Sequence, residues 1–189
     1  MRNDKNSDEL HSEFWKLYQS LRKDTKKKWN RVLPFNELLF DRWEKANFLK
    51  SKNNASVYDS SYIFGNVSIG KNTWIGPNTI LDGSGGKLSI GDFCSISSGV
   101  QIYTHHTVDW SLTGGKADYA KKSVRIGDNC YVGPNSIIQM GVSIGKCSVI
   151  GAQSFVNSKI PANSIVFGSP GKIVGKVIVK NKKVTFDYF

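Results

Sequence analysis

The most regular feature of the sequence is an aliphatic side chain at every sixth position. The run begins at Val57 and continues at Ile63, Ile69, Ile75 and Leu81, then, after a three-residue slip, at Ile90, Ile96 and Ile102, and, after a longer interruption, at Ile126, Val132, Ile138, Ile144, Ile150 and Val156. Glycine directly follows many of these residues, and a small or β-branched residue stands four positions after most of them. A period of six fits neither the 3.6-residue repeat of a helix nor the two-residue alternation of a strand. The pattern therefore predicts a repeat architecture.

Each six-residue repeat is explained by one short strand followed by a bend. Three such repeats close a triangular coil, in which the aliphatic side chains stack inward and the corner glycines relieve crowding of the backbone. Successive coils pair through parallel ladders at a spacing of about 4.8 Å. The fourteen matches give between four and five coils. We therefore expect an all-β solenoid with one continuous core.

A helical segment is predicted before the repeat. Residues 7–28 have the spacing of an amphipathic helix, and a second helix is expected from 36 to about 50, with Leu39, Trp43 and Ala46 facing inward. These helices either cover the open end of the solenoid, because exposed strand edges recruit other chains, or form a lid over a functional site.

The segment after the repeat alternates in polarity, which predicts a small hairpin that turns at Asn181. The chain is thus expected to contain a helical segment (1–56), the repeat region (57–175, with an inserted loop at 103–123) and a C-terminal hairpin or tail (176–189).

The repeat consensus, aliphatic–Gly–x–x–small–x, resembles the left-handed parallel β-helix of hexapeptide-repeat acyltransferases. The stretch at 160–170, Ile-Pro-Ala-Asn-Ser-Ile-Val-Phe-Gly-Ser-Pro, is similar to the final coil of that family. Residues 76–82 and 101–105 look like bacterial polysaccharide and lipopolysaccharide O-acetyltransferases, and they are also similar to the maltose and galactoside acetyltransferase branch. The resemblance implies a homotrimer that holds acetyl-CoA, the acyl donor, in the grooves between neighbouring β-helices.

The longest interruption of the repeat opens with two of the three histidines, His105 and His106. Insertions in solenoids commonly lie on the binding face, and acetyl transfer to an alcohol needs a base, a role that neutral imidazole fills near pH 7. We hypothesise that His105 removes the hydroxyl proton as the oxygen attacks the thioester directly. Family members often read Tyr-Thr-His-Asp here, which favours His105, whereas the maltose branch favours His106. Asp109 either orients one imidazole or is a surface carboxylate of the loop.

No metal centre is expected. Metal-dependent members of this fold need three histidine ligands, and the remaining His11 lies in the predicted N-terminal helix. Cys94, Cys130 and Cys147 show no C-x-x-C spacing, and the first two occupy small-residue positions of the repeat, so we expect buried reduced thiols.

Residues that contact the donor and the acceptor are implied by the resemblance. Gly141 and Ala152 would let the backbone approach the pantetheine arm, with simple repeat geometry as the alternative, and Lys172 would lie near the nucleotide phosphates. The candidates for the acceptor sugar are Trp74, Asn78, Asp82, Asp109 and Trp110. The asparagine that holds the sugar in galactoside enzymes corresponds to Gly76, which argues against free galactoside or maltose. Asp82 has the alternative role of stabilising the Asp-Gly-Ser-Gly turn that it opens.

The formal net charge of +11 raises the question of a nucleic-acid partner. The excess is distributed along the chain, because residues 1–56 hold 13 Lys/Arg against 8 Asp/Glu and the remainder holds 13 against 7. No nucleic-acid motif accompanies it, so no such partner is expected, and a phosphate-rich small ligand explains the charge as well.

The sequence shows neither a membrane span of about 18–20 apolar residues nor a signal peptide, so we expect a cytoplasmic protein. A lipid-linked acceptor would bring it to the membrane periphery.

These observations favour an acetyl-CoA-dependent O-acetyltransferase acting on a sugar hydroxyl of a surface glycan or its precursor. The alternatives are an N-acetyltransferase of a nucleotide-linked amino sugar and a small-molecule acetyltransferase that modifies antibiotics. A non-enzymatic scaffold predicts regular coils without a histidine-bearing insertion, so the sequence argues against it.

Overall fold

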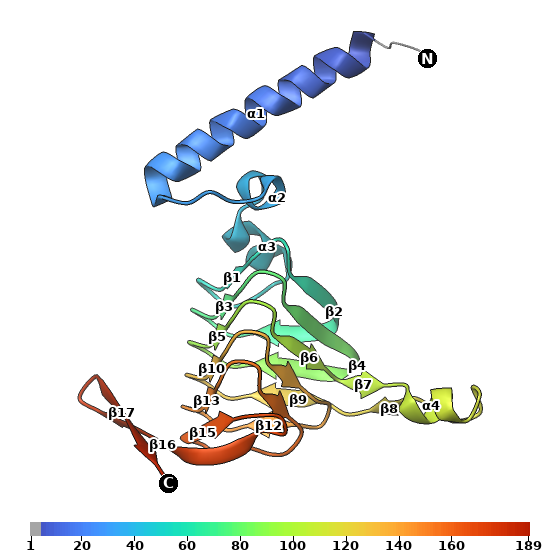
Figure 1. Ribbon diagram of the computed structural model, residues 1–189, viewed down its shortest axis with the longest axis vertical. Helices are drawn as coiled ribbons and strands as arrows, with labels where there is room; N and C mark the ends of the chain where they lie inside the picture. Colours follow the sequence, from blue (N-terminus) through green and yellow to red (C-terminus); the bar gives the residue numbers. More distant parts are fainter. Residues whose placement is uncertain (1–4) are drawn as a thin grey trace.

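The computed structural model describes residues 5–189, and Met1–Asp4, which open the predicted helical segment, lie outside the described residues. Short strands stack into a triangular solenoid (Figure 1). Helices α1 (Lys5–Trp29), α2 (Phe35–Leu39) and α3 (Arg42–Phe48) lie at one end of the stack, and a strand hairpin lies at the other. The predicted solenoid with its N-terminal helices and C-terminal hairpin is thus confirmed.

The solenoid has three faces, which we number in chain order. The first face pairs in parallel β1 (Ser56–Val57), β3 (Trp74–Ile75), β5 (Ser95–Ile96), β10 (Tyr131–Val132), β13 (Val149–Ile150) and β15 (Ser164–Phe167). The second face pairs the first parts of β2 (Tyr62–Ile69) and β4 (Ile80–Ile90) with β6 (Gln101–Tyr103), β11 (Ile137–Ile138) and β14 (Phe155–Val156). The third face pairs the last parts of β2 and β4 with β9 (Val124–Ile126) and β12 (Ser143–Ile144). A bridge from Ile144 to Ile160 closes a fifth coil.

The core is the stack of aliphatic side chains that the period of six predicts. Ile75, Leu81 and Ile102 are fully buried, whereas Ile63 of the first coil is only partly buried and packs against the end of the core. Burying each such side chain contributes about 1.5–3 kcal/mol. The small positions satisfy backbone groups between coils, because the Ser136 hydroxyl donates to the Gly151 carbonyl at 2.8 Å.

The three-residue slip in the sequence is a bulge in β4. Gly65 pairs with Gly83 and Val67 pairs with Leu88, so β4 uses more residues than β2 to turn the same corner. The bulge lies between the second and third faces. It allows the ladder to continue while leaving extra backbone at that corner.

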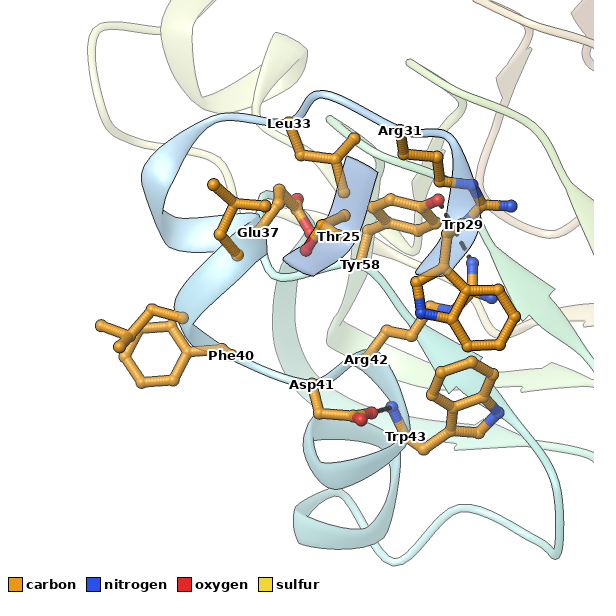
Figure 2. Close-up of a pocket in the computed structure, with 12 residues that line it drawn as sticks. Thr25, Trp29, Arg31, Leu33, Glu37, Phe40, Asp41, Arg42, Trp43 and Tyr58 are labelled. Carbon is orange, nitrogen blue, oxygen red and sulfur yellow. Dashed lines mark hydrogen bonds between the residues drawn. The ribbon is translucent and has the colours of Figure 1, made fainter. Parts of the chain in front are cut away.

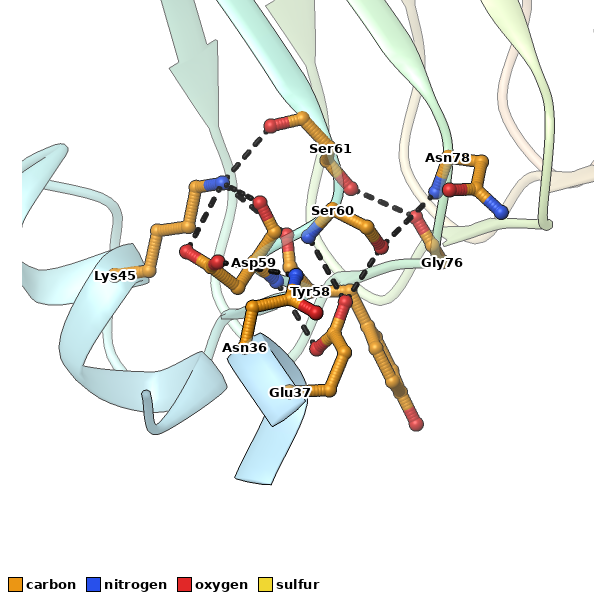
Figure 3. A network of polar contacts seen from close by, with 9 residues as sticks. All are labelled: Asn36, Glu37, Lys45, Tyr58, Asp59, Ser60, Ser61, Gly76 and Asn78. Atoms are coloured by element: carbon orange, nitrogen blue, oxygen red, sulfur yellow. Dashed lines mark hydrogen bonds and ion pairs between the residues drawn. The ribbon is translucent and has the colours of Figure 1, made fainter. Parts of the chain in front are cut away.

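Helices α2 and α3 cover the open end of the first coil (Figure 3), as in the first of the two alternatives above, whereas α1 extends away from the solenoid (Figure 1). Lys45 of α3 donates to the carbonyl oxygens of Asp59 and Ser61 at 2.6 and 2.8 Å. Glu37 of α2 accepts the backbone N–H groups of Asp59 and Ser60. These backbone groups at the exposed end of the first coil are therefore paired.

The prediction of one continuous helix from 36 to 50 is wrong, because the structure divides this segment into α2 and α3. Phe40 is extended, and the Asp41 carboxylate accepts the Trp43 N–H at 2.7 Å, which starts a new helix. Ala46 is buried as expected, but Leu39 and Trp43 are 43% and 41% exposed rather than inward.

The C-terminal hairpin consists of β16 (Lys172–Lys180) and β17 (Lys183–Tyr188), paired antiparallel. Its turn contains Asn181 and Lys182 with positive φ angles of 46° and 65°, which confirms the predicted turn. The hairpin begins earlier than expected, because β16 pairs antiparallel with β15 and thereby ends the parallel stack. None of the helices within residues 5–189 is long and apolar enough to span a bilayer.

The model of an inward-stacked core predicts the stability of two neighbouring variants. Ile126→Ala should reduce the free energy of unfolding by about 2–5 kcal/mol, because Ile126 is buried in the middle of the stack. Arg125→Ala, on the exposed side of the same strand, should change it by no more than about 0.5 kcal/mol. Denaturant titration monitored by circular dichroism measures both, and equal losses would contradict the stacking.

Candidate active site

The longest interruption of the solenoid is an arm that leaves the corner between the second and third faces. The chain departs after β6 and returns at β9. The arm begins as a short antiparallel ladder of β7 (His105–His106) with β8 (Ala120–Lys121), and α4 (Val108–Leu112) lies toward its tip (Figure 1). The two histidines therefore stand at the base of the arm, where it joins the rigid stack.

The ladder of β4 with β6 places a buried carboxylate beside the first of these histidines, because Asp82 pairs in register with Tyr103. Asp82 Oδ2 lies 3.2 Å from His105 Nδ1, in contact although not aligned as a hydrogen bond. Asp82 is only 7% exposed, and its Oδ1 accepts the Ser84 N–H at 2.8 Å. A Cβ on Gly85 would lie 2.5 Å from His105 Cβ, so only glycine leaves room for the imidazole there.

Backbone contacts fix this pair. The Thr104 hydroxyl donates to the Asp82 carbonyl at 2.8 Å and accepts the Gly85 N–H at 2.9 Å. The second histidine is engaged differently, because His106 Nδ1 accepts the Val108 N–H at 3.3 Å at the start of α4. His105 therefore faces a carboxylate, whereas His106 is tied to the arm.

A pocket of about 430 Å³ opens in front of the pair. Its lining comprises Asp82, Tyr103, His105, His106, Thr107, Val108, Ile137, Gln139, Met140 and Phe155. The surface of the pocket is largely apolar, with contributions from Val108, Ile137, Met140 and Phe155, and it also carries the polar groups of Asp82 and His105. This combination is typical of a site that binds an organic ligand and performs acid–base chemistry.

Other hollows lack this chemistry. A hollow of about 210 Å³ at the junction of α1, α2 and α3 (Figure 2) contains Trp29, Trp43 and Tyr58. Its polar groups serve the helix junction, since the Arg42 guanidinium lies 4.2 Å from the centre of the Trp43 ring and donates to the Tyr58 hydroxyl at 3.2 Å. A larger hollow, about 1040 Å³ on the third face, contains no histidine.

The structure separates the remaining candidates for donor contacts. Gly141 follows β11 at the corner from which the arm leaves, whereas Ala152 precedes β14 at the opposite edge of the second face. Lys172 is exposed at the start of β16. One chain alone therefore does not bring Gly141 and Ala152 to the same groove.

The acceptor candidates also occupy different places. Trp74 lies on the first face against Tyr58, and Asn78 is a corner residue with φ of 57°. Asp109 and Trp110 lie in α4, where the Trp110 ring packs edge-on against Tyr119 with 5.7 Å between centres. In this structure His105 is paired with Asp82 rather than with Asp109.

Several lining residues were missed by the sequence reasoning. Ile137 and Phe155 directly precede inward aliphatic residues, so they point outward on the second face. Apolar residues at outward positions were a usable signal. Gln139 and Met140 gave none, because their proximity to His105 depends on how coils stack.

The cysteines lie elsewhere. The thiols of Cys94 and Cys130 are buried and contact the carbonyls of Gly127 and Gly145, as the serines at equivalent positions do. A hydrogen bond to Cys94 and burial raise the pKa of the Cys130 thiol. Cys147 is only partly buried, and no group of three or more metal-ligand side chains occurs among the described residues.

Residues 123–158 match the family model described as bacterial transferase hexapeptide (six repeats). The chain belongs to the hexapeptide-repeat transferase family. Its solenoid is accordingly the left-handed parallel β-helix that the resemblance implied. Galactoside O-acetyltransferase of Escherichia coli is 34% identical over 126 residues, which cover 65% of this chain and 61% of that protein. The chain thus spans about three fifths of the length of the curated relatives it matches.

Solved structures extend the similarity over more of the chain. The hexapeptide-repeat acetyltransferase VCA0836 of Vibrio cholerae, complexed with acetyl-CoA, is 26% identical with a TM-score of 0.63. The match covers 85% of this chain and 87% of that one. Galactoside acetyltransferase in complex with coenzyme A is 25% identical, with a TM-score of 0.62, and the match covers 84% and 82%.

The geometry predicts a raised pKa for Tyr103, which lines the pocket. Burial and the charge of Asp82 raise the pKa of Tyr103, because both disfavour the phenolate. Asp82→Asn should lower this pKa toward the ordinary value. Absorbance titration at alkaline pH, with Tyr103→Phe identifying the transition, measures the change. An unaltered transition in Asp82→Asn would show that the carboxylate does not act on Tyr103.

Proposed function

We propose that this protein is an acetyl-CoA-dependent O-acetyltransferase that acts on a sugar hydroxyl of a surface glycan or its precursor. The observation that carries the proposal is the contact of His105 with the buried Asp82 at the mouth of a largely apolar pocket. The family supports acetyl transfer, and the acetyl-CoA and coenzyme A bound to two similar structures support the donor. The relative from E. coli that acts on galactosides supports a sugar acceptor.

In the proposed reaction His105 is the general base. Its Nδ1 faces the Asp82 carboxylate, which leaves Nε2 to take the proton of the acceptor hydroxyl. The acceptor oxygen forms a bond to the thioester carbon, and the C–S bond then breaks. The imidazolium returns its proton to the departing thiolate, so atoms and charge balance. Backbone N–H groups stabilise the negative charge that develops on the carbonyl oxygen.

Asp82 is proposed as a positioning residue rather than a sugar ligand. A carboxylate beside Nδ1 favours the tautomer whose Nε2 carries the free lone pair, and it stabilises the imidazolium that forms. His106 is less suited to the same role, because its Nδ1 already accepts a backbone N–H of the arm. This difference supports His105 over His106.

We further propose a homotrimer whose subunit grooves hold acetyl-CoA. Gly141 and Ala152 stand at opposite edges of the second face, so they could meet one donor molecule only where two subunits adjoin. Ile137 and Phe155 offer apolar surface for the pantetheine arm, and Lys172 offers a positive charge for the phosphates. These assignments need no further cofactor and no metal.

For the acceptor we propose contacts from Asp109 and Trp110 of the arm, and contacts from Trp74 and Asn78 of a neighbouring subunit, since within one chain these two residues lie elsewhere. Trp110 is 42% exposed on the arm, and an exposed ring suits stacking against a sugar. A glycan precursor made in the cytoplasm, free or lipid-linked, is the acceptor class we propose. A lipid-linked acceptor would place the reaction at the membrane surface.

The role of His105 is tested by its replacement. His105→Ala should lower kcat by about 10²- to 10⁴-fold for acetyl transfer from acetyl-CoA to a sugar acceptor, because a positioned base is lost. His106→Ala is the matched control and should retain most of the activity. Release of coenzyme A, measured with a thiol reagent, follows the reaction. Equal activity in both variants would remove the assignment.

Asp82→Asn separates the charge of Asp82 from its role in the turn. The asparagine oxygen can still accept the Ser84 N–H, but the negative charge beside His105 is gone. We expect kcat to fall roughly tenfold, less than for His105→Ala, with KM for acetyl-CoA nearly unchanged. A rise in KM without a fall in kcat would instead mark Asp82 as a ligand of substrate.

A further inference from the structure

Helix α1 carries an apolar surface that the rest of its own chain does not cover. The helix extends away from the β-helix (Figure 1), and it packs on α2 through Phe14 and Tyr18, whose rings lie 6.3 and 5.6 Å from that of Phe35. Leu10, Phe14 and Leu17 remain between 41% and 54% exposed. A helix of this length depends on packing of its apolar face for stability.

The charges of α1 are separated along its length. The first half carries three acidic residues, Asp8, Glu9 and Glu13, against two lysines at positions 5 and 16, whereas the second half carries five basic residues against Asp24. These basic residues are Arg22, Lys23, Lys26, Lys27 and Lys28. The helix dipole favours such an order only within the first and last turns, and Glu13 lies beyond the first turn. The separation therefore needs a further explanation.

The basic end also forms a hollow with an apolar part. Arg22, Lys23, Lys26 and Lys27 line a space of about 390 Å³ together with Val32, which is 64% exposed. The neighbouring Trp29 is 53% exposed beside the helix junction (Figure 2). We call the surface formed by residues 22–32 the basic end. It suits a partner that presents acidic and apolar side chains together.

The first half of α1 has that chemistry, but it cannot reach the basic end of its own helix. Glu13 and Lys26 are separated by about 20 Å at 1.5 Å per residue. We propose that the first half of α1 docks on the basic end of a second copy of this chain. The apolar side chains at 10, 14 and 17 would pack on Trp29 and Val32, and Glu9 and Glu13 would face the lysines.

This contact joins two different surfaces, so it is heterologous and can close into a ring. This proposal rests on the homotrimer proposed above, in which each α1 would pack on α1 of the next subunit. An anionic lipid surface is the competing occupant of the basic end. Glu9 and Glu13 oppose it, since by helical spacing they lie beside the apolar side chains that would have to enter the membrane.

The test reverses the charges on each side and then on both. Glu9→Lys with Glu13→Lys, and separately Lys26→Glu with Lys27→Glu, should each raise the dissociation constant of the full-length assembly roughly tenfold in sedimentation equilibrium. The combined variant should return to within about threefold of the original protein, because the pairs are restored with opposite signs. Added salt should weaken the original assembly.

A matched control for Lys26→Glu with Lys27→Glu makes the same change of net charge at another place on the surface. Lys176→Glu with Lys180→Glu alters two exposed residues of β16 and should leave the assembly unchanged. If the protein is a trimer and the charge reversals on α1 have no effect, or the combined variant is not restored, the docking of α1 is overturned while the trimer stands. If the full-length protein is a monomer, both proposals fail.

Sedimentation with vesicles of phosphatidylglycerol and phosphatidylcholine tests the competing occupant. The original protein should remain in the supernatant, because the basic end is covered by its neighbour. Vesicle binding that is lost in Lys26→Glu with Lys27→Glu, without any effect of that variant on assembly, would assign the basic end to lipid and overturn the proposal.

Discussion

The inward stacking of one aliphatic side chain per six-residue repeat is the constraint on which the rest of this structure depends. Each strand is too short to be stable alone, and it persists because parallel ladders join it to the coils above and below. Serine, threonine and cysteine side chains at the small positions bind carbonyl groups of the next coil, so the corners are also satisfied. The result is a rigid prism whose corners can carry irregular segments.

The candidate site exists because two irregularities meet at one corner of that prism. Asp82 stands at the corner in one coil, directly before the bulge of β4, and the departure of the arm brings His105 to it in the next. Neither irregularity interrupts the core, since Leu81 and Ile102 on the same strands stay fully buried. The rigid β-helix thus holds the site residues in place, and the irregular segments contribute the reactive side chains.

The two ends of the β-helix are capped in different ways. At the first coil, Lys45 and Glu37 pair the open backbone groups, which leaves α1 to project with its apolar face exposed. At the last coil, β16 reverses direction against β15 and β17 extends the sheet. In the homotrimer that we propose, a neighbouring subunit would cover the projecting helix and complete the donor groove.

The sequence alone determined the fold, because a strict period of six leaves the solenoid as the arrangement that buries every repeated aliphatic residue. It also singled out His105, His106 and Asp82, since each stands where the repeat is interrupted. Only the tertiary structure decided that Asp82, rather than Asp109, faces His105. Asp82 and His105 lie 23 positions apart in sequence. Their contact depends on the stacking of consecutive coils and on the size of the bulge that lies between them in the chain. The division of the second helix was likewise decided by local contacts of Asp41 and Lys45 that no hydrophobic period records.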